Sequence, residues 1–380
     1  MDIISSIASI NAIIIAILIS NKKKKRINDY ILIFWIINFA LHFAIPFCIE
    51  RQFLFHESIW GLVLGIIMVT HGPFLYVYTK SLTSTNFKFN FRNFYHFGFI
   101  LLYAATFLPM LSLSPQMIMD IVEQKSDLSL YVLLPMLTLL FIQIYFLVRT
   151  IILIIEHQAS IKQSFSFVEK INLNWIKLIV YGYMGLIFLS FILYGLASAQ
   201  IISVFWMDYI LIMCNMVLFF YIVYYGYKQN AIQLVIPIAA KNKSKHTFKI
   251  LPETKTKKPE PDNISKIHSP IISELLHIMD EEQLYLEPEL NIGNIANKLH
   301  IHSHQLSKII NTQLNKNFFE FVNDYRVKEF KRLVSDPKNK NISILGLAYD
   351  AGFNSKATFY RFFKNSTGLT PSEFREEYQF

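Results

Sequence analysis

Apolar residues lie in long runs over roughly the first 229 residues of this 380-residue chain, and in short periodic stripes after that. A helix needs about 20 consecutive apolar residues to cross the hydrocarbon core of a bilayer. Seven runs come close to this length, near residues 3–20, 29–48, 58–79, 94–113, 129–154, 176–199 and 204–227. Residues 1–229 are therefore predicted to form a bundle of seven transmembrane helices.

Basic residues between the runs indicate the orientation of that bundle. The run Lys22-Lys23-Lys24-Lys25-Arg26 follows the first span, whereas the charges of a cleaved signal peptide precede its apolar segment. Alternate connections are also basic, with Lys80, Lys88, Arg92, Arg149, Lys162, Lys170 and Lys177, while the opposite ones hold only Arg51 and Lys125. Because cytoplasmic loops carry an excess of Lys and Arg, we expect the N-terminus outside and everything after Lys228 in the cytoplasm.

Polar side chains inside the spans are scattered. Asn38, His42 and His71 are the candidates for sensing a signal within the membrane. His71 leads because "THGPFLY" places it beside Gly72-Pro73, a pair expected to break the helix and free backbone groups. Packed and hydrogen-bonded core residues are the plainer interpretation of all three. No relay spacing, HExxH or CxxC pattern is present, so we expect no metal, no cofactor and no enzymatic centre.

Charge alone does not indicate a nucleic-acid partner. The net charge is +9, but residues 1–230 hold 15 Lys and Arg against 10 Asp and Glu, and the remainder holds 21 against 17. Residues 230–266 are rich in Lys and Pro with little helical periodicity, and they predict an exposed cytoplasmic linker.

The helical period of 3.6 residues returns in residues 267–380, which predicts a soluble all-helical domain. Its first helix-turn-helix is expected over about 291–315. Asn291 caps a short helix, a turn follows at His300-Ile301, and Ser303 caps a second helix.

The same layout then repeats at about 343–366. Ser343 caps a helix, Ala351-Gly352-Phe353 forms the turn, and Ser355 opens the next helix. The apolar positions of the two second helices are displaced by 53 residues, whereas those before the turn are displaced by 52, so the second turn holds one extra residue. One long amphipathic helix, about 317–335, is expected between the two units.

The exposed faces of the two second helices suit the major groove of DNA, where Lys or Arg donates hydrogen bonds to guanine. The first face shows Ser303, His304, Ser307 and Lys308, and the second shows Lys356, Tyr360 and Lys364 beside Arg361. An ordinary solvated face would explain either one. The repetition of the whole layout favours two recognition helices.

The stretch "ILGLAYDAGFNSKATFYRFFKNSTGLTPSEFR" closely resembles the C-terminal signature of AraC-type (AraC/XylS) transcription regulators, with A-x-x-x-G-F, F-x-R-x-F-K and G-x-T-P-x-x-F-R. "IANKLHIHSHQLSKIIN" resembles the first helix-turn-helix of that family, and the resemblance covers about residues 271–378. It implies base contacts by His304, Ser307, Lys308, Lys356, Ala357, Tyr360 and Arg361, and phosphate contacts by Asn317 and Lys364. Ser303, on the same exposed face as His304, is expected to contact a base as well.

Two departures from the family pattern concern the first unit. His300 stands where the second unit has Gly352, and Lys308 stands where the family often has Arg, which would bind guanine in bidentate fashion. We therefore expect the first unit to contribute less sequence specificity.

The membrane half resembles the membrane-embedded members of the family in architecture alone. The resemblance implies a sequence-specific regulator in the bacterial inner membrane that couples a membrane or extracytoplasmic signal to promoter binding. Its expected partners are promoter DNA, the lipid bilayer, RNA polymerase and an unidentified signal ligand or membrane protein, with a homodimer as one candidate assembly. Two alternatives stay open: an anchored regulator whose tail is released by proteolysis, and a transporter or enzyme with a regulatory tail.

Overall fold

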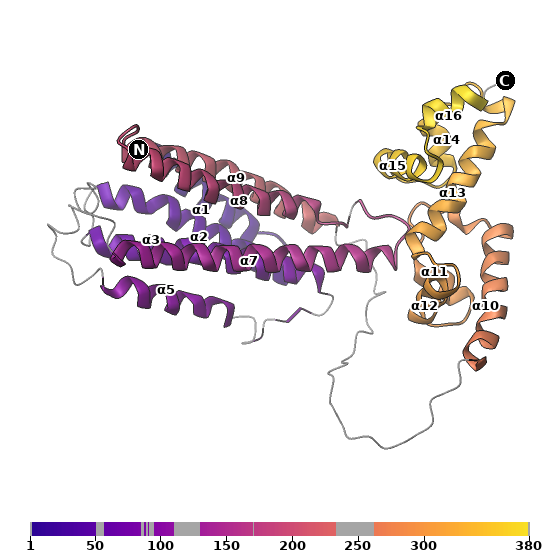
Figure 1. The fold of residues 1–380 in the computed structure, drawn as a ribbon, viewed down its shortest axis with the longest axis horizontal. Helices are drawn as coiled ribbons and strands as arrows, with labels where there is room; N and C mark the ends of the chain where they lie inside the picture. The colour runs from indigo at the N-terminus through magenta and orange to yellow at the C-terminus, as the bar shows by residue number, and fades with distance from the viewer. Residues whose placement is uncertain are drawn as a thin grey trace, which may run out of the picture. The chain divides into compact units, whose positions relative to one another are not determined.

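The structure is a computed structural model that describes residues 2–50, 57–84, 87–88, 90, 95–109, 130–169, 171–232 and 262–378. All regular elements in these ranges are helical, which confirms the expected all-α fold class. The chain divides into two compact units (Figure 1). One consists of Met1–Ile155 and Leu173–Leu234, and the other of Glu156–Asn172 and Val235–Phe380.

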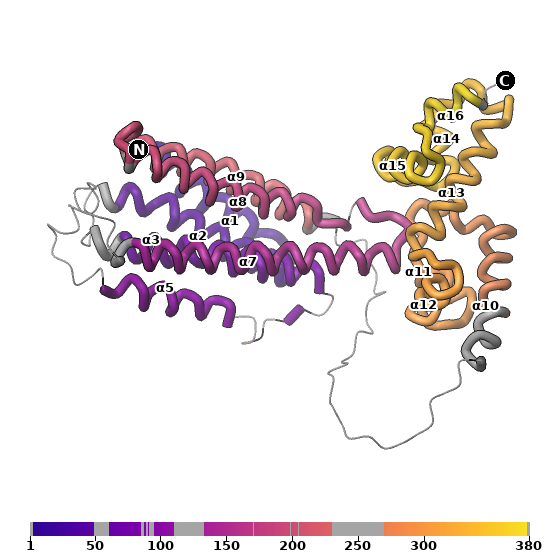
Figure 2. Tube along the Cα trace, in the orientation of Figure 1, coloured from indigo at the N-terminus to yellow at the C-terminus, as the bar shows by residue number. Residues whose placement is uncertain are grey.

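The first unit is a bundle of long helices that lie side by side (Figures 1 and 2). Its elements are α1 (Asp2–Ser20), α2 (Ile27–Glu50), α3 (Glu57–Thr83), η1 (Tyr95–Gly98), α5 (Phe99–Phe107), α7 (Leu130–Lys162), α8 (Asn174–Ser198) and α9 (Val204–Ile232). Helix α2 packs against α1, α3 and α9, and α8 packs against α9. Aromatic side chains fill the centre, with Trp35, Phe39, Phe43 and Phe219 almost fully buried.

Six of these helices are long and apolar enough to cross a membrane, and they coincide with six of the seven predicted spans. The fourth predicted span, 94–113, begins with the shorter apolar helix Tyr95–Phe107. Residues 110–129, where that span would end, lie outside the described residues. The seventh crossing therefore stays a prediction.

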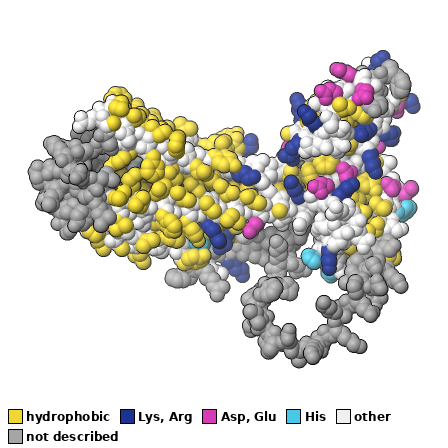
Figure 3. Space-filling view, in the orientation of Figure 1, with side chains coloured by type: hydrophobic (Ala, Val, Ile, Leu, Met, Phe, Trp, Pro, Cys, Tyr) yellow, Lys and Arg dark blue, Asp and Glu magenta, His cyan; other side chains and the backbone are white. Residues whose placement is uncertain are grey.

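The outward side chains of this unit are apolar. Leu101, Ile3 and Val217 are 76%, 75% and 73% exposed, and Figure 3 shows hydrophobic side chains over most of the visible face of the bundle. In the second unit, the large apolar side chains exposed among the described residues are Ile342 and Tyr349. Soluble proteins rarely expose continuous apolar surface, so the outside of the bundle suits lipid rather than water.

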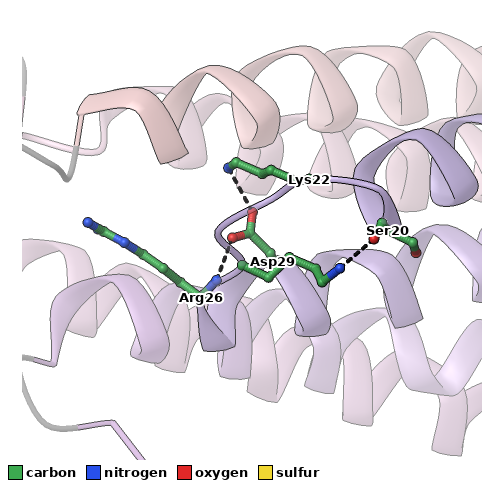
Figure 4. Close-up of polar contacts among 5 residues, drawn as sticks. Ser20, Lys22, Arg26 and Asp29 are labelled. Atoms are coloured by element: carbon green, nitrogen blue, oxygen red, sulfur yellow. Dashed lines mark hydrogen bonds and ion pairs between the residues drawn. The ribbon is translucent and has the colours of Figure 1, made fainter.

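The basic run after α1 forms a tight connection to α2 (Figure 4). Asp29, in the first turn of α2, accepts a hydrogen bond from the backbone N–H of Arg26 at 2.7 Å and pairs with Lys22 Nζ at 3.2 Å. The Lys25 ammonium donates to the carbonyl oxygen of Ser20 at the end of α1. The Asp29 side chain is fully buried. Part of the basic run thus stabilises the turn itself.

The expected break at Gly72-Pro73 is not observed, because α3 continues through Pro73. Gly72 instead allows a close approach between helices. A Cβ atom there would lie 3.0 Å from Gln143 Oε1 and 3.1 Å from the Cβ of Phe146, both on α7.

The second unit contains two small helical subdomains joined by a long helix. Its elements are α10 (Asp262–Glu281), η4 (Leu284–Leu286), α11 (Ile292–Lys298), α12 (Ser303–Gln313), α13 (Phe318–Val334), η5 (Pro337–Asn339), α14 (Ile344–Asp350), α15 (Lys356–Thr367) and α16 (Pro371–Tyr378). One apolar core surrounds α11 and α12, and a second surrounds α14 and α15. Helix α13 contributes to both cores. Residues 233–261, most of the predicted linker, lie outside the described residues.

Small polar side chains begin three of the four helices in the two helix-turn-helix pairs. Asn291, Ser343 and Ser355 each accept a hydrogen bond from the backbone N–H three residues later, at 3.2, 3.0 and 3.1 Å. These contacts satisfy donors that lack a partner within the helix. The three predicted caps are confirmed.

The fourth predicted cap, Ser303, is wrong. The N-cap of α12 is His302, which has extended backbone angles, and its N–H donates to the Gln305 side chain at 3.2 Å. Ser303 is the first residue of the helix. Equivalent residues within the two turns are 52 positions apart, but the N-caps that follow them, His302 and Ser355, are 53 positions apart. The extra residue of the second turn is therefore Asn354, directly before Ser355.

The motif "GLTP" joins α15 to α16 by a local mechanism. Gly368 ends α15 with a positive φ of 81°, and its N–H donates to the carbonyl of Lys364. Thr370 and Glu373 exchange hydrogen bonds between side chain and backbone, and Pro371 occupies the first position of α16. Phe374 then lies in the second core.

The two turns place very different demands on the residue with positive φ. At Gly352, φ is 90°, and a Cβ atom would lie 2.3 Å from the carbonyl oxygen of Tyr285. At the equivalent position, His300 has φ 52° and an exposed side chain. The first turn therefore tolerates His at the cost of modest strain, while the second requires Gly.

We predict that Gly352→Ala destabilises the second unit by about 2 kcal/mol or more, because a left-handed conformation and a backbone clash act together. His300→Gly should change the same quantity by about 1 kcal/mol or less, since only strain is relieved. Hydrogen exchange of the α11–α15 amides in the full-length chain measures both. Equal effects of the two substitutions would contradict this account of the turns.

Candidate nucleic-acid interface

Helix α12 separates an apolar inner face from a polar outer face. Leu306, Ile309 and Ile310 are at most 1% exposed and pack into the first subdomain. On the other face, His304 and Lys308 are exposed, and Ser303 and Ser307 are partly exposed. All four predicted base-contacting residues of this helix thus lie on surface that a ligand can reach.

Helix α15 repeats the arrangement. Phe359 and Phe363 are fully buried in the second core, where their ring centroids lie 4.7 and 5.2 Å from that of Phe330 on α13, in tilted and edge-to-face arrangements. The predicted base-contacting residues lie on the outer face: Lys356, Ala357 and Arg361 are exposed and Tyr360 is partly exposed. The Lys356 ammonium lies 5.6 Å from the centroid of the Tyr360 ring. The outer face thus presents two cations and one aromatic hydroxyl group.

The two predicted phosphate contacts are placed at helix ends. Asn317 is the N-cap of α13 and uses its side-chain oxygen to accept the N–H of Glu320 at 2.9 Å, which leaves its amide N–H₂ group as the donor suited to phosphate. Lys364 is exposed in the last turn of α15. An anion near Asn317 would also meet the positive end of the α13 dipole.

Acidic residues of this unit concentrate elsewhere, on and just after α10. Glu274, Asp280, Glu281, Glu282, Glu287 and Glu289 are all exposed. They account for six of the 14 carboxylates in residues 266–380, which carry 14 Lys and Arg. From residue 290 onward the balance is 13 basic to eight acidic residues. The positive character is therefore confined to the part of the domain that holds α12 and α15.

Within the first unit, the three predicted sensing residues lie together. Trp35 Nε1 donates to His71 Nδ1 at 3.1 Å, and His71 Nε2 lies 3.1 Å from His42 Nδ1. Asn38 Nδ2 lies 3.4 Å from His71 Nδ1, and the Asn38 side-chain oxygen accepts a hydrogen bond from the Thr70 hydroxyl at 2.9 Å. The cluster therefore joins α2 to α3 through buried polar contacts.

The direction of this hydrogen-bond chain follows from Trp35. An indole N–H only donates, so His71 must accept at Nδ1 and carry its proton on Nε2, which then donates to His42. The buried Tyr183 hydroxyl, which has no hydrogen-bond partner in the described residues, belongs to a ring 6.3 Å from the His71 ring. Among the described residues, no group of three or more His, Cys, Asp or Glu could hold a metal ion.

The second unit also contains a buried polar cluster around Arg326 that the sequence does not predict. The guanidinium of Arg326 on α13 is buried and contacts backbone oxygens of Tyr285 and Glu287 at 2.8 and 2.7 Å. It also contacts Ser166, which precedes it by 160 residues. An arginine in the pattern "NDYRVKEF" resembles any solvated helix residue, and no local signal marks it as buried.

Comparison with known proteins points to one functional class. Residues 295–377 match the helix-turn-helix domain family. A probable transcription factor, PqrA of Proteus vulgaris, is 34% identical over 96 residues, which are 25% of this chain and 76% of that protein. The Msm operon regulatory protein of Streptococcus mutans is 33% identical over 90 residues. That match spans 24% of this chain and only 31% of the relative.

A solved structure of a protein of unknown function from Listeria innocua aligns over its full length with 29% of this chain, at 28% identity and a TM-score of 0.26. That score is too low to bear on the fold. The match to PqrA extends over three quarters of the length of that protein. The 295–377 region that matches the helix-turn-helix domain family holds the signature motifs and both α12 and α15. Through its C-terminal region, the chain belongs to the AraC-type helix-turn-helix transcription regulators.

Proposed function

We propose that this chain is a membrane-bound transcription regulator that binds promoter DNA directly and changes its binding in response to a signal in or beyond the membrane. One observation carries the proposal. The same polypeptide holds two helix-turn-helix units, whose second helices α12 and α15 have exposed polar and basic faces, and six helices that are long and apolar enough to span a bilayer. Each half would be unsuited to the solvent of the other.

The proposed arrangement follows the positive-inside rule. The N-terminus lies outside, and both the Lys22–Arg26 connection and the DNA-binding unit lie in the cytoplasm of a bacterial cell. An odd number of crossings, here seven, is needed to place the two ends of the chain on opposite sides of the membrane. The partners are double-stranded promoter DNA, the lipid bilayer, RNA polymerase and a signal ligand or membrane protein. A homodimer would place two DNA-binding units on one promoter.

Base recognition is assigned to the outer faces of α12 and α15, with Asn317 and Lys364 on phosphates. The assigned residues are Ser303, His304, Ser307, Lys308, Lys356, Ala357, Tyr360 and Arg361. Their exposure supports this assignment, as does the burial of the opposite face of each helix. Arg361 can contact guanine through a rigid planar fork of two N–H donors, whereas the Lys308 ammonium is a point charge on a flexible stem.

We predict that Lys308→Ala/Arg361→Ala removes the discrete peaks in genome-wide DNA occupancy of the full-length chain in its own host. Each contact is worth roughly 1–3 kcal/mol of discrimination, so the loss of both should lower specific affinity by at least about 30-fold. Lys298→Ala/Arg332→Ala is the matched control. It removes the same two charges from side chains that are paired with Glu282 and Glu329. Peaks that survive the first double substitution would exclude these helices as the readers.

The orientation is testable with two engineered cysteines that flank α8, in a chain with Cys48 and Cys214 replaced by Ala. Ile201→Cys should react with a membrane-impermeant maleimide in intact cells, because Ile201 is exposed in the turn between α8 and α9, on the proposed outer side. Gln163→Cys should react only after lysis. The reverse labelling pattern would place the DNA-binding unit outside the cell and would contradict the proposal. A free fragment with the size of the C-terminal DNA-binding unit, detected by immunoblotting of the same cells, would support proteolytic release.

The Trp35–His71–His42 chain is the proposed sensing site, because it is a buried polar network that connects two candidate spans. We predict that His71→Leu keeps the DNA peaks but makes their occupancy the same in every growth condition that changes wild-type occupancy. Asn215→Leu is the control, since the Asn215 side chain on α9 donates a hydrogen bond one turn back within its own helix, to the carbonyl oxygen of Leu211. A normal response of the His71 variant would remove the cluster from sensing.

A further inference from the structure

The connection between α7 and α8 is built into the DNA-binding unit. The unit boundary falls inside α7, so its last turns and the residues up to Asn172 belong with residues 235–380. The N–H of Ile292 donates to Ser164 O at 2.9 Å, and the N–H of Ser166 donates to Leu290 O at 3.1 Å. Phe165 and Asn291 form an isolated antiparallel bridge. Residues 163–169, the clamp loop, thus lie along the segment that enters the first helix-turn-helix.

The polar atoms of Ser166 complete the buried cluster around Arg326. Arg326 Nη1 donates to Ser166 O at 3.3 Å, and Nη2 donates to Ser166 Oγ at 3.2 Å. Asn323 Nδ2 also donates to Ser166 O, at 3.1 Å, and Ser166 Oγ donates to Leu290 O at 2.7 Å. Burial lowers the pKa of Arg326 to about 9, so its guanidinium is still charged at neutral pH. Among the described residues, the Arg326 side chain makes five hydrogen bonds, and two of them are to Ser166 of the clamp loop.

The loop also reaches the second helix-turn-helix. Phe167 and Val168 are buried in a small apolar cluster with Ile161, Ile171 and Phe319 of α13. Phe362 of α15 packs against that cluster, with its ring 5.7 Å from that of Phe319. The Thr358 hydroxyl, on the inner face of α15, donates to Glu169 Oε1 at 2.9 Å. One short loop therefore contacts the first subdomain, the linking helix and the second recognition helix.

We infer that the clamp loop holds the two helix-turn-helix subdomains in the relation that allows both to read DNA, and that α7 and α8 act on DNA binding through it. This inference rests on the proposed function. The loop continues directly into α7, itself a candidate membrane span, and returns to the chain through α8. A change in the position of either helix would pull on contacts made to both subdomains. No contact through the linker 230–266 is needed.

A clamp of this kind has a distinctive energetic signature. Two recognition helices on one face of DNA bind targets about one helical turn apart. Fixing their relation in advance lowers the ordering cost of binding both targets, but it does not affect binding of one. Loss of the clamp should therefore weaken binding to a two-half-site operator and spare binding to a single half-site.

The test uses the full-length chain in lipid nanodiscs and two DNA fragments from one occupancy peak, one intact and one with a half-site scrambled. Phe167→Ala removes the most buried aromatic contact of the clamp loop. It should lower affinity for the intact fragment by about tenfold, as expected when two linked sites become independent, and change affinity for the scrambled one less than about twofold. Gln163→Ala, at an exposed position on the same loop, should match the wild type.

Thr358→Val guards against a folding defect. It removes only the hydroxyl group that donates to Glu169, and it should weaken intact-fragment binding by roughly fivefold, the equivalent of one hydrogen bond. Hydrogen exchange should become faster at the amides of Ser166 and Ile292 in the Phe167 variant. Equal losses on both fragments, unchanged binding, or tighter binding would each overturn the clamp. If the wild-type chain binds neither fragment, the proposed function itself has failed, before any loop variant is compared.

Discussion

The buried guanidinium of Arg326 is the contact on which the DNA-binding unit depends most. A buried charge must have its donors satisfied, and here they are satisfied by oxygens from the 285–287 segment, the linking helix and the clamp loop. Arg326 Nε would lie only 3.1 Å from a Cβ at Gly352. The turn of the second helix-turn-helix can approach this cluster because that residue has no side chain. A single side chain thus fixes the relation of segments that are far apart in the sequence.

The two units differ in how their backbone groups find partners. In the bundle, long helices pair most of their own N–H and C=O groups, as a hydrocarbon environment would require, and apolar side chains face outward. In the DNA-binding unit the four helices of the two helix-turn-helix pairs have 7 to 12 residues, so a large share of their backbone groups lies at helix ends. Asn291, Asn317, Ser343 and Ser355 satisfy donors there and leave the outer faces available for a polar ligand.

Features with a local cause were predictable from the sequence. Span positions follow from apolar length, and three caps follow from residue type next to periodic segments. The N-cap of α12 was not predicted correctly because serine, the residue type favoured at N-caps, occupies the first helical position, while the adjacent His302 is the N-cap. The candidate sensing residues were named singly, but their meeting required α2 and α3 to pack with a particular rotation. The roles of Arg326 and the clamp loop were not predictable for the same reason, since the hydrogen bonds of the clamp loop to the rest of the unit join residues 124 to 189 positions apart. No periodicity encodes such pairs.

The proposed coupling between the bundle and promoter binding needs only small free energies. A tenfold change in promoter occupancy corresponds to about 1.4 kcal/mol, close to the net worth of one or two hydrogen bonds. The clamp loop makes more than two hydrogen bonds to the rest of the DNA-binding unit. Loss of some of them would therefore be enough for a tenfold change in occupancy. A ligand in the bundle would need only to favour one position of α7 or α8 by a comparable amount, because a population shift is limited by differential affinity for the two states. Coupling through a docked loop therefore needs no large rearrangement of either helical unit.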